Sequence, residues 1–360
     1  MEEPSVRNLD EYCDRVCVSQ SRPGALVAAL RMAASIARRR AFHQNLLASR
    51  AAAQTLADWT DGRSFDVVIA GQLPMYRYVQ PLWRRAAVLD SHNHEAARIR
   101  GIAEARGSLP RRIAARLQMV PVERYERDVV LQVALTLAVS AAECQAFERV
   151  APGRVRLVPN GVDLERIPHV GGPPSSADIL FVGSLDYTAN ADGVDTFMRE
   201  VAPRVGTPDA RFLIVGSNPP AWLRSAAGRS ALNTQVLGFV DDLEPLMRGS
   251  RVLVVPLLRG GGTRLKILEA LAWGIPVVTT TAGCAGLDLT AGEHALVEDE
   301  PGPFAAAIDR LIQDDALWSN LSGRGRALVE DRYGWQAVGD QLDAALREAI
   351  PLSPAAPMMD

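Results

Sequence analysis

The stretch Arg259-Gly-Gly-Gly-Thr-Arg-Leu-Lys-Ile-Leu-Glu-Ala-Leu-Ala-Trp-Gly-Ile-Pro-Val-Val-Thr-Thr280 decides the fold. It reads as the end of a strand, a triple-glycine turn, a short apolar helix over 265–273, a stop at Gly274 and another strand. Strands that alternate with helices in this way are typical of a parallel sheet with crossover helices. The stretch therefore predicts an α/β fold.

The glycine turn and the helix after it form a candidate anion site. Gly260 to Gly262 permit close approach of the backbone, and the amides at the N-terminus of the helix are suited to bind an anion. Arg264 and Lys266 place two cations in the first turn, where they oppose the helix dipole unless an anion is bound. Glu269 can accept hydrogen bonds from ribose or sugar hydroxyls. A flexible turn with solvated charges is the alternative, but the whole arrangement favours a phosphate ligand.

The composition is that of a globular protein with room for two domains. The chain has 360 residues, of which 48% are hydrophobic, which excludes a disordered chain, a fibre and a disulfide-stapled mini-protein. It has no apolar run of about 18 residues, so no spanning helix is predicted, and its acidic start leads into no signal core. Cys13, Cys17, Cys144 and Cys284 are scattered, as expected of reduced thiols. We therefore expect a cytoplasmic location.

The charges are distributed unevenly along the chain. Residues 1–160 hold 23 arginines against 16 acidic residues, which leaves 16 basic and 26 acidic residues in the remainder. This asymmetry suggests different partners for the two halves. The basic half lacks interleaved aromatic residues, so nucleic acid is not an expected partner. Lys266 is the only lysine among 39 basic residues, which raises the question of what arginine cannot do there.

Strand-like runs alternate with helix-length segments in both halves of the chain. In the first half they lie at 15–18, 65–70, 87–90, 134–139 and 155–158. In the second half they lie at 179–182, 212–215, 235–237, 252–256, 277–280 and 295–297, and a further helix is predicted over 192–205. A breaker-rich stretch at 171–176 separates the two series. We predict domains at 1–168 and 178–336, a linker at 169–177, and a C-terminal helix and tail at 337–360 that packs back on the first domain.

The beginning of the first domain departs from this pattern. Residues 1–60 contain a single glycine, Gly24, and the segment before Arg15 is too polar for a central parallel strand. We expect the opening β-turn-α unit to be absent or degenerate, which would expose a strand edge near Val16 and Ile69 and favour self-association. Either the reading frame starts further upstream or the chain needs a partner.

The stretch 259–280 closely resembles the donor-binding segment of glycosyltransferase family 4, in the subgroup with a Gly-Gly-Gly-Thr-Arg-Leu-Lys loop. Four other segments resemble the family in order and spacing: Val158-Pro-Asn-Gly-Val-Asp163, Leu180-Phe-Val-Gly-Ser184, Leu237-Gly-Phe-Val-Asp-Asp242 and Asp331-Arg-Tyr-Gly-Trp335. The resemblance implies the GT-B fold class, with two doubly wound Rossmann-like domains that face a central cleft. It also implies that the second domain binds a nucleotide-sugar and the first binds the acceptor.

The resemblance assigns residues to the donor site. Glu269 matches the family glutamate that holds the nucleotide ribose, whereas Gly261 stands where the family has a glutamate that touches the transferred sugar. The expected donor-binding residues are Gly183, Ser184, Phe239, Val240, Gly260, Gly261, Gly262, Thr263, Leu265 and Glu269.

The cations that neutralise the diphosphate depart from the family pattern. Ser184 and a position near Asn190 stand where the family usually has an arginine and a lysine. We therefore expect Arg264 and Lys266 to supply the charge, as in the subgroup with this loop, and to be catalytic.

One histidine of the first domain also matches the family. The segment Leu89-Asp-Ser-His-Asn-His-Glu95 follows a predicted strand and faces the expected cleft. His92 matches the family histidine near the reacting anomeric centre, where it would bind a sugar hydroxyl or steady the acceptor; His94 matches none. The alternative is that His92 only caps a loop. The other histidines are interpreted as surface or packing residues, and no metal site is predicted: His43, His169 and His294.

Two basic segments of the first domain are candidates for contact with a membrane. Residues 111–124 are basic, and residues 25–47 combine arginines with apolar residues at helical spacing: Leu26, Leu30, Ala33 and Ile36, beside Arg31, Arg38, Arg39 and Arg40. Such a pattern suits an anionic membrane surface that carries lipid-linked acceptors. A solvated helix face is the alternative.

The resemblance thus predicts a retaining, metal-independent glycosyltransferase of the hexosyltransferase type that needs no cofactor. It would move a sugar from a nucleoside diphosphate sugar to an acceptor hydroxyl of a carbohydrate, a lipid-linked molecule or a small molecule, in polysaccharide, glycolipid or other glycoconjugate synthesis. A nucleotide-sugar epimerase or hydrolase would need a further acid/base pair, which the sequence does not offer. A non-catalytic nucleotide-sugar-binding subunit of another transferase is the other alternative, because Gly261 replaces the family glutamate.

Overall fold

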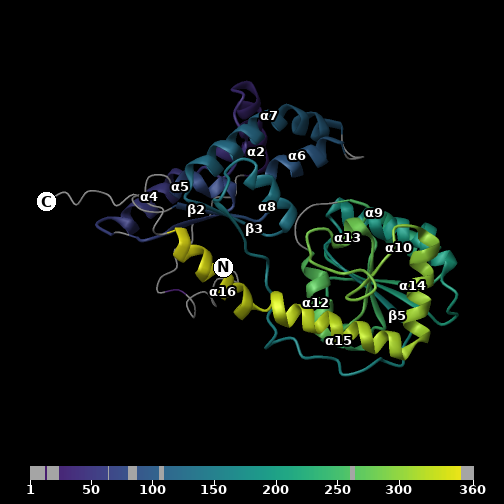
Figure 1. Ribbon diagram of the computed structural model, residues 1–360. Coiled ribbons are helices and arrows are strands. Elements are labelled where there is room, and N and C mark those ends of the chain that lie inside the picture. The colour runs from purple at the N-terminus through teal and green to yellow at the C-terminus, as the bar shows by residue number, and fades with distance from the viewer. Residues whose placement is uncertain are drawn as a thin grey trace.

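The computed structural model describes Cys13 and residues 24–63, 65–79, 87–104, 109–259 and 264–349. Figure 1 shows two lobes, each built on a sheet of parallel strands flanked by helices. The α/β class predicted from the sequence is confirmed.

The first lobe holds a four-stranded parallel sheet. Its strands follow one another in the order β1-β2-β3-β4, so the chain winds across the sheet in one direction. The predicted strand at 15–18 lies outside the described residues. The strands are β1 (Val68–Gly71), β2 (Ala87–Ser91), β3 (Leu135–Ala138) and β4 (Val155–Leu157). The helices are α2 (Ala25–Ala37), α3 (His43–Leu46), α4 (Arg50–Thr60), η2 (Leu73–Met75), α5 (Tyr76–Val79), α6 (Glu95–Glu104), α7 (Leu109–Gln132) and α8 (Ala141–Glu148).

The second lobe holds a six-stranded parallel sheet in the doubly wound order β10-β9-β8-β5-β6-β7. Its strands are β5 (Asp178–Val182), β6 (Arg211–Val215), β7 (Asn233–Gly238), β8 (Val252–Val255), β9 (Val277–Thr279) and β10 (Leu296–Val297). Its helices are α9 (Thr188–Thr196), η4 (Phe197–Val201), η5 (Ala202–Arg204), α10 (Ala221–Ala227), α11 (Glu244–Gly249), α12 (Leu265–Trp273), α13 (Thr281–Cys284), α14 (Pro301–Gln313) and α15 (Asp315–Arg332). The chain reverses its winding direction between β5 and β8, which are neighbours.

Local sequence explains where the helices at this reversal begin and end. α12 spans the predicted residues, and it ends at Gly274, whose φ of 80° is left-handed and therefore suits glycine. α9 begins at Thr188, four residues before the predicted start at position 192, and it continues through a π-turn and a 3-10 turn to Arg204. The earlier start brings Asn190 into the first turn of α9.

Two of the segments that carry the family resemblance meet where the chain returns to the first lobe. The amide of Val162 donates to the carbonyl of Tyr333 at 2.8 Å. A Cβ atom at Gly161 would come within 2.6 Å of the indole of Trp335, so glycine is required there. The final helix, α16 (Trp335–Ala349), then packs Ala345 and other apolar residues against β2 and β3 of the first lobe.

The outer strand of the first sheet bears on the predicted self-association. Among the described strands β1 pairs only with β2, and Ile69 on β1 is 43% exposed. Val16 lies outside the described residues. Self-association stays a prediction, which light scattering of the purified chain tests.

Candidate functional site

The reversal of winding between β5 and β8 creates the place where a ligand site is expected in the second lobe. In open parallel sheets, ligands bind beyond the carboxyl ends of the strands at such a switch point. The loop after β5 leads into α9, and the loop after β8 leads into α12. In neither helix does an N-cap side chain bond the first-turn amides, and neither has an acidic residue in its first turn. Both helix N-termini thus favour negative charge.

Lys266 is the centre of this site. Its Nζ atom donates to Oδ1 of Asn190 at 2.9 Å and lies 4.5 Å from the ring centre of Phe181. Asn190 is itself buried and donates through Nδ2 to the carbonyl of Ser184 at 2.7 Å. A Cβ atom at Gly183 would collide with both Nζ of Lys266 and the amide of Asn190. The ammonium group is therefore held against the loop that follows β5.

The surroundings of Lys266 disfavour its charged form. Burial and the charge of Arg264 lower the pKa of Lys266 to about 7, while Glu269 on the next turn of α12 raises it slightly. Burial also raises the pKa of Glu269, and Lys266 opposes that shift. A bound anion would reverse the penalty on the ammonium. The electrostatics of this arrangement thus favour the binding of a negatively charged ligand.

Arg264 precedes α12 and is 6% exposed. Burial lowers its pKa, and the electrostatic interaction and the hydrogen bond with Tyr187 oppose that shift. Tyr187 stands at the start of α9, so the two helix N-termini are linked through this contact. The structure brings both predicted cations, Arg264 and Lys266, to the switch point.

The loops after β5 and β6 approach each other closely. The amide of Gly183 donates to the carbonyl of Val215 at 2.9 Å, and a Cβ atom at Gly216 would collide with the carbonyl of Gly183. Ser184 lies in the same loop, where its hydroxyl donates to the carboxylate of Asp186 and lies 2.9 Å from the hydroxyl of Ser217. The Ser184 hydroxyl is thus engaged within the loop.

The remaining predicted donor-binding residues are spread more widely. Phe239 follows β7, is 72% exposed, and makes no hydrogen bond or ring contact with Lys266 among the described residues. Val240 is half-buried against the apolar core beneath α12, and Leu265 is 43% exposed. Gly260, Gly261, Gly262 and Thr263 lie outside the described residues.

In the first lobe, His92 lies just beyond the carboxyl end of β2. Its Nε2 atom is 3.0 Å from Oδ2 of Asp90, and its Nδ1 atom is 3.5 Å from Nε2 of Gln72. The hydrogen bond that His92 donates to Asp90 raises the pKa of His92, against the effect of burial. Gln72 follows β1 and has a φ of 75°, which is uncommon for a residue with a side chain. Among the described residues, no hydrogen bond or ion pair joins His92 to the Lys266 site.

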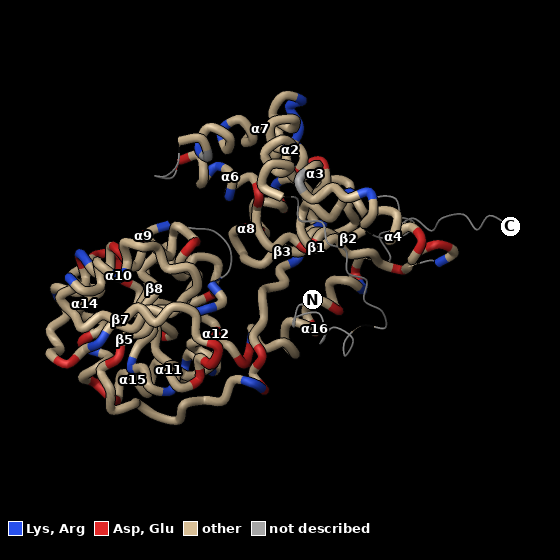
Figure 2. The backbone as a smooth tube through the Cα atoms, turned by 180° about the vertical axis from the view of Figure 1, so that it is seen from behind, with Lys and Arg blue, Asp and Glu red and all other residues tan. Residues whose placement is uncertain are grey.

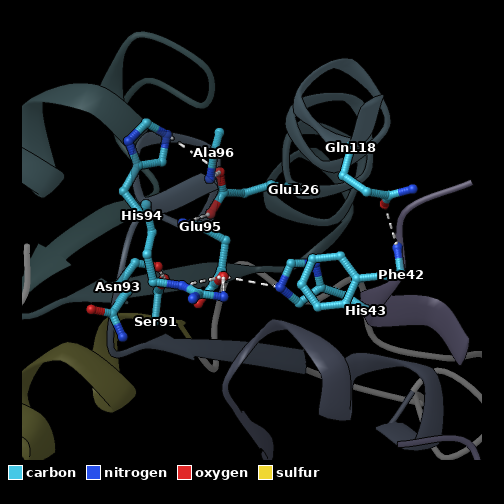
Figure 3. Close-up of polar contacts among 10 residues, drawn as sticks. Phe42, His43, Ser91, Asn93, His94, Glu95, Ala96, Gln118 and Glu126 are labelled. Atoms are coloured by element: carbon cyan, nitrogen blue, oxygen red, sulfur yellow. Dashed lines mark hydrogen bonds and ion pairs between the residues drawn. The ribbon is translucent and has the colours of Figure 1, made fainter. Parts of the chain in front are cut away.

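A buried carboxylate, Glu126, which is drawn in Figure 3, and a half-buried one, Glu143, anchor the loop that carries His92. Glu126 on α7 accepts from the amides of Glu95 at 2.7 Å and Ala96 at 3.0 Å, so it caps the N-terminus of α6. Glu143 on α8 accepts from the amide of His94 at 3.1 Å. Burial raises the pKa of Glu126 to about 7 and raises that of Glu143 as well. The loop therefore depends on side chains from two other helices.

Two histidines complete this cluster. His43 is buried, and its Nε2 atom lies 2.9 Å from the carboxylate of Glu95, which also accepts from Arg98 (Figure 3). Burial alone would raise the pKa of Glu95, but the bonds from His43 and Arg98 lower it overall. His94 lies 3.3 Å from Glu126 and packs against Phe147, and burial lowers its pKa.

Sequence reasoning missed most of these partners. The sequence did not predict the contact between His43 and Glu95, because the two residues lie 52 positions apart. No local pattern predicted the role of Glu126 within the basic α7 segment. His169 contacts Ser322 at 3.2 Å, and His294 accepts from the amide of Thr290 at 3.0 Å.

No group of three or more His, Cys, Asp or Glu side chains in the described part of the chain could hold a metal ion. None of the described helices combines the length and apolarity needed to cross a bilayer.

Both halves of the chain match family models of glycosyltransferases. Residues 10–166 match the model described as Glycosyltransferase Family 4, and residues 176–314 match the model described as Glycosyl transferases group 1. The two sheets and the site at the switch point define a protein of the GT-B class. The chain belongs to glycosyltransferase family 4.

A curated relative is the phosphatidyl-myo-inositol mannosyltransferase of Mycobacterium tuberculosis. It is 32% identical over 199 residues, which cover 51% of this chain and 52% of the relative. The chain thus spans about half the length of such curated relatives.

Solved structures share the fold. The sucrose-phosphate synthase of Thermosynechococcus elongatus superposes with a TM-score of 0.66 at 18% identity, over 83% of this chain and 77% of that one. Alr3699/HepE of Anabaena, in complex with UDP and glucose, superposes with a TM-score of 0.66 at 16% identity, over 97% of this chain and 90% of that one. The predicted GT-B fold class is confirmed.

Proposed function

We propose that the protein is a retaining, metal-independent glycosyltransferase that binds a nucleoside diphosphate sugar at the switch point of its second lobe. The observation that carries the proposal is the buried ammonium of Lys266, packed between Phe181, Asn190 and Gly183 where two helix N-termini converge. A cation in that position is disfavoured by burial and by the helix dipoles until an anion binds. A diphosphate supplies that anion.

The proposed reaction breaks the bond between the anomeric carbon and the diphosphate oxygen and forms a bond to the acceptor hydroxyl oxygen on the same face of the sugar. The acceptor proton passes to the departing diphosphate oxygen. Arg264 and Lys266 would stabilise the charge that develops on the leaving group, which is the kind of preorganisation that dominates many enzymes. Glu269 would hold the ribose, and the reaction would need no cofactor.

His92 would act from the first lobe, on the acceptor side. Its place beyond the carboxyl end of β2, and its bond to Asp90, supports a role in which the imidazole steadies the sugar or the acceptor near the anomeric carbon. In this proposal residues 1–168 form the acceptor domain and residues 178–336 the donor domain.

The acceptor is proposed to be a hydroxyl-rich glycoconjugate precursor at the cytoplasmic face of a membrane. A relative named as a phosphatidyl-myo-inositol mannosyltransferase supports this class. So do exposed apolar side chains on two helices of the first lobe that lie within or beside arginine-rich segments: Leu26 and Leu30 on α2, with Leu109, Ile113, Leu117 and Val120 on α7. Figure 2 shows arginine positions, in blue, along α6 and α7. Such surfaces suit peripheral contact with anionic lipid.

A non-catalytic subunit that binds a nucleotide-sugar is the second candidate, because Gly261 replaces the family glutamate. Two measurements on the purified chain separate the candidates. A thermal-shift screen of nucleotide-sugars identifies the donor, since a ligand at 100 times its Kd stabilises by about 2.7 kcal/mol. Transfer of labelled sugar to extracted lipid and to free polyols then tests catalysis. Donor binding without transfer would favour the subunit, and absence of both would refute the proposal.

A further inference from the structure

A cavity of about 640 Å³ lies in the first lobe, apart from the candidate site. It is lined by the turn between α2 and α3, by α5 and by the C-terminal half of α7, and neither His92 nor Gln72 lines it. Its volume falls within the range of about 300–1,000 Å³ that is usual for small-molecule sites.

The cavity carries a concentrated positive charge. Arg39, Arg40, Arg77 and Arg124 line it, against a single acidic residue, Asp128, so its formal charge is four minus one, or +3. Among the described residues, no carboxylate lies within ion-pair distance of any of these four guanidinium groups. Elsewhere in the chain, arginines are commonly paired with acidic side chains. A bound anion would therefore relieve the repulsion among the four guanidinium groups.

The lining is also ordered and rich in hydrogen-bonding groups. The Tyr76 hydroxyl donates to Oε1 of Gln132 at 3.1 Å, and Arg77 donates to the carbonyl of Gln44. Arg39 has a φ of 50°, an uncommon conformation for a non-glycine residue, of the kind that clusters at ligand sites. Guanidinium groups bind phosphate oxygens through paired N–H donors, and amide and hydroxyl groups suit a polyol.

An exposed apolar stripe leads along α7 into the cavity. Leu109, Ile113, Leu117 and Val120 are between 47% and 72% exposed. Their spacing of three or four residues places them on one face of the helix, and the same spacing continues to Arg124 and Asp128 in the cavity. A ligand that joins a phosphate to an apolar chain would match this surface.

We propose that this cavity binds the phosphate ester of a hydroxyl-bearing ligand, and that the headgroup of an anionic membrane phospholipid supplies it. The apolar stripe favours the lipid over a free phosphorylated polyol, which offers the same phosphate chemistry. The assignment uses none of the donor-site residues, so it goes beyond the proposed transferase function and does not depend on it.

The test compares two double variants of the full chain that each remove two positive charges. Arg40→Gln with Arg124→Gln removes two cavity arginines, whereas the control, Arg116→Gln with Arg127→Gln, removes two exposed arginines of α7 that do not line the cavity. Vesicle sedimentation with phosphatidylcholine, with and without phosphatidylinositol, forms the lipid arm. Calorimetric titration with glycerol phosphate, and with glycerol as the neutral probe, forms the second arm. Circular dichroism verifies that both variants fold.

We expect the cavity variant to bind phosphatidylinositol vesicles at least about tenfold more weakly than the control variant, because each lost charge-assisted bond weakens binding by roughly tenfold or more. A difference confined to glycerol phosphate would uphold the phosphate site and assign it to a free ligand. Equal binding by the two variants in both arms would overturn the proposal, as would an absence of binding by the wild type. UDP-glucose affinity should be unchanged in the cavity variant, which keeps this test separate from that of the donor site.

Discussion

The ammonium of Lys266 and the side-chain amide of Asn190 lie 2.9 Å apart, and they join the first turn of α12 to the first turn of α9. The only lysine of the chain therefore bridges the two helices that flank the switch point. The space around Nζ is closed by Phe181 and by Gly183. A planar guanidinium is wider than an ammonium group, which explains why arginine, used at the other 38 basic positions, does not serve here.

Lys266→Met and Lys266→Arg test this relationship. We expect both variants to weaken the binding of a nucleotide-sugar about tenfold or more, since each loses a charge-assisted bond to the diphosphate in its proper geometry. The melting temperature of free Lys266→Met should be unchanged or slightly raised, because a buried cation at the positive end of a helix is removed. Arg347→Gln, which breaks the surface ion pair with Asp343 on α16, is the control. A large loss of stability in Lys266→Met with donor affinity intact would contradict the phosphate role.

The lowered pKa of Lys266, about 7, predicts how donor binding depends on pH. Above that pKa the amine is neutral in the free protein, whereas a bound diphosphate raises its pKa, so binding takes up a proton. The Kd for UDP-glucose should then rise between about pH 7 and pH 9, by at most about tenfold per pH unit. UDP-glucose is the suitable probe because it lacks a terminal phosphate that titrates near pH 6. The profile of Lys266→Met should be flat, and a pH dependence shared by both proteins would assign it to another group.

His92 and His94 should respond differently to replacement by alanine. His92→Ala should lower kcat by about a hundredfold or more with little change in donor affinity, because His92 lies on the first lobe and would act on the reacting sugar. Asp90→Asn should lower the pKa seen in the pH profile of kcat, because Asp90 raises the pKa of His92. His94→Ala should instead lower the melting temperature, since His94 packs against Phe147 beside Glu126. Equal losses of turnover in both variants would show that the loop matters and not one imidazole.

The local parts of this site could be predicted from the sequence, whereas the pairings between elements could not. The helix over 265–273 follows from its apolar periodicity and from Gly274, and the resemblance to family 4 selected the loops around the switch point. The contact between Lys266 and Asn190 joins residues 76 positions apart, so it depends on which strands become neighbours. The early start of α9 also brings Asn190 into that contact. No local pattern carries this information.

The roles of the carboxylates in the first lobe could not be predicted either, because they too depend on contacts between elements that lie far apart in the sequence. Glu126 lies in a helix in which arginines outnumber acidic residues, and its role appears only when α7 packs beside the N-terminus of α6. A glutamate within such a helix ordinarily indicates a solvated ion pair. The tertiary packing of α6 on α7 turns it into a cap.

Glu126 is expected to make the stability of the first lobe depend on pH. Its pKa is raised to about 7 in the folded protein, from about 4.5 when unfolded, so its contribution to stability is fully present below about pH 4.5 and is lost as the pH rises through 7. Converted at 1.36 kcal/mol per pKa unit, the whole effect is of the order of 3 kcal/mol.

Two neighbouring groups also titrate in this range. The raised pKa of Glu143 acts on stability in the same direction as that of Glu126, whereas the lowered pKa of His94 makes the protein less stable as the pH falls below about 6.5. The melting temperature measured from pH 5 to pH 8 should therefore decline, and Glu126→Gln should flatten this decline because the amide does not titrate. Glu104→Gln, at the exposed end of α6, is the matched control and should keep the wild-type profile. If Glu126→Gln declined as steeply as Glu104→Gln, the pH dependence would belong to other groups and the raised pKa of Glu126 would be wrong.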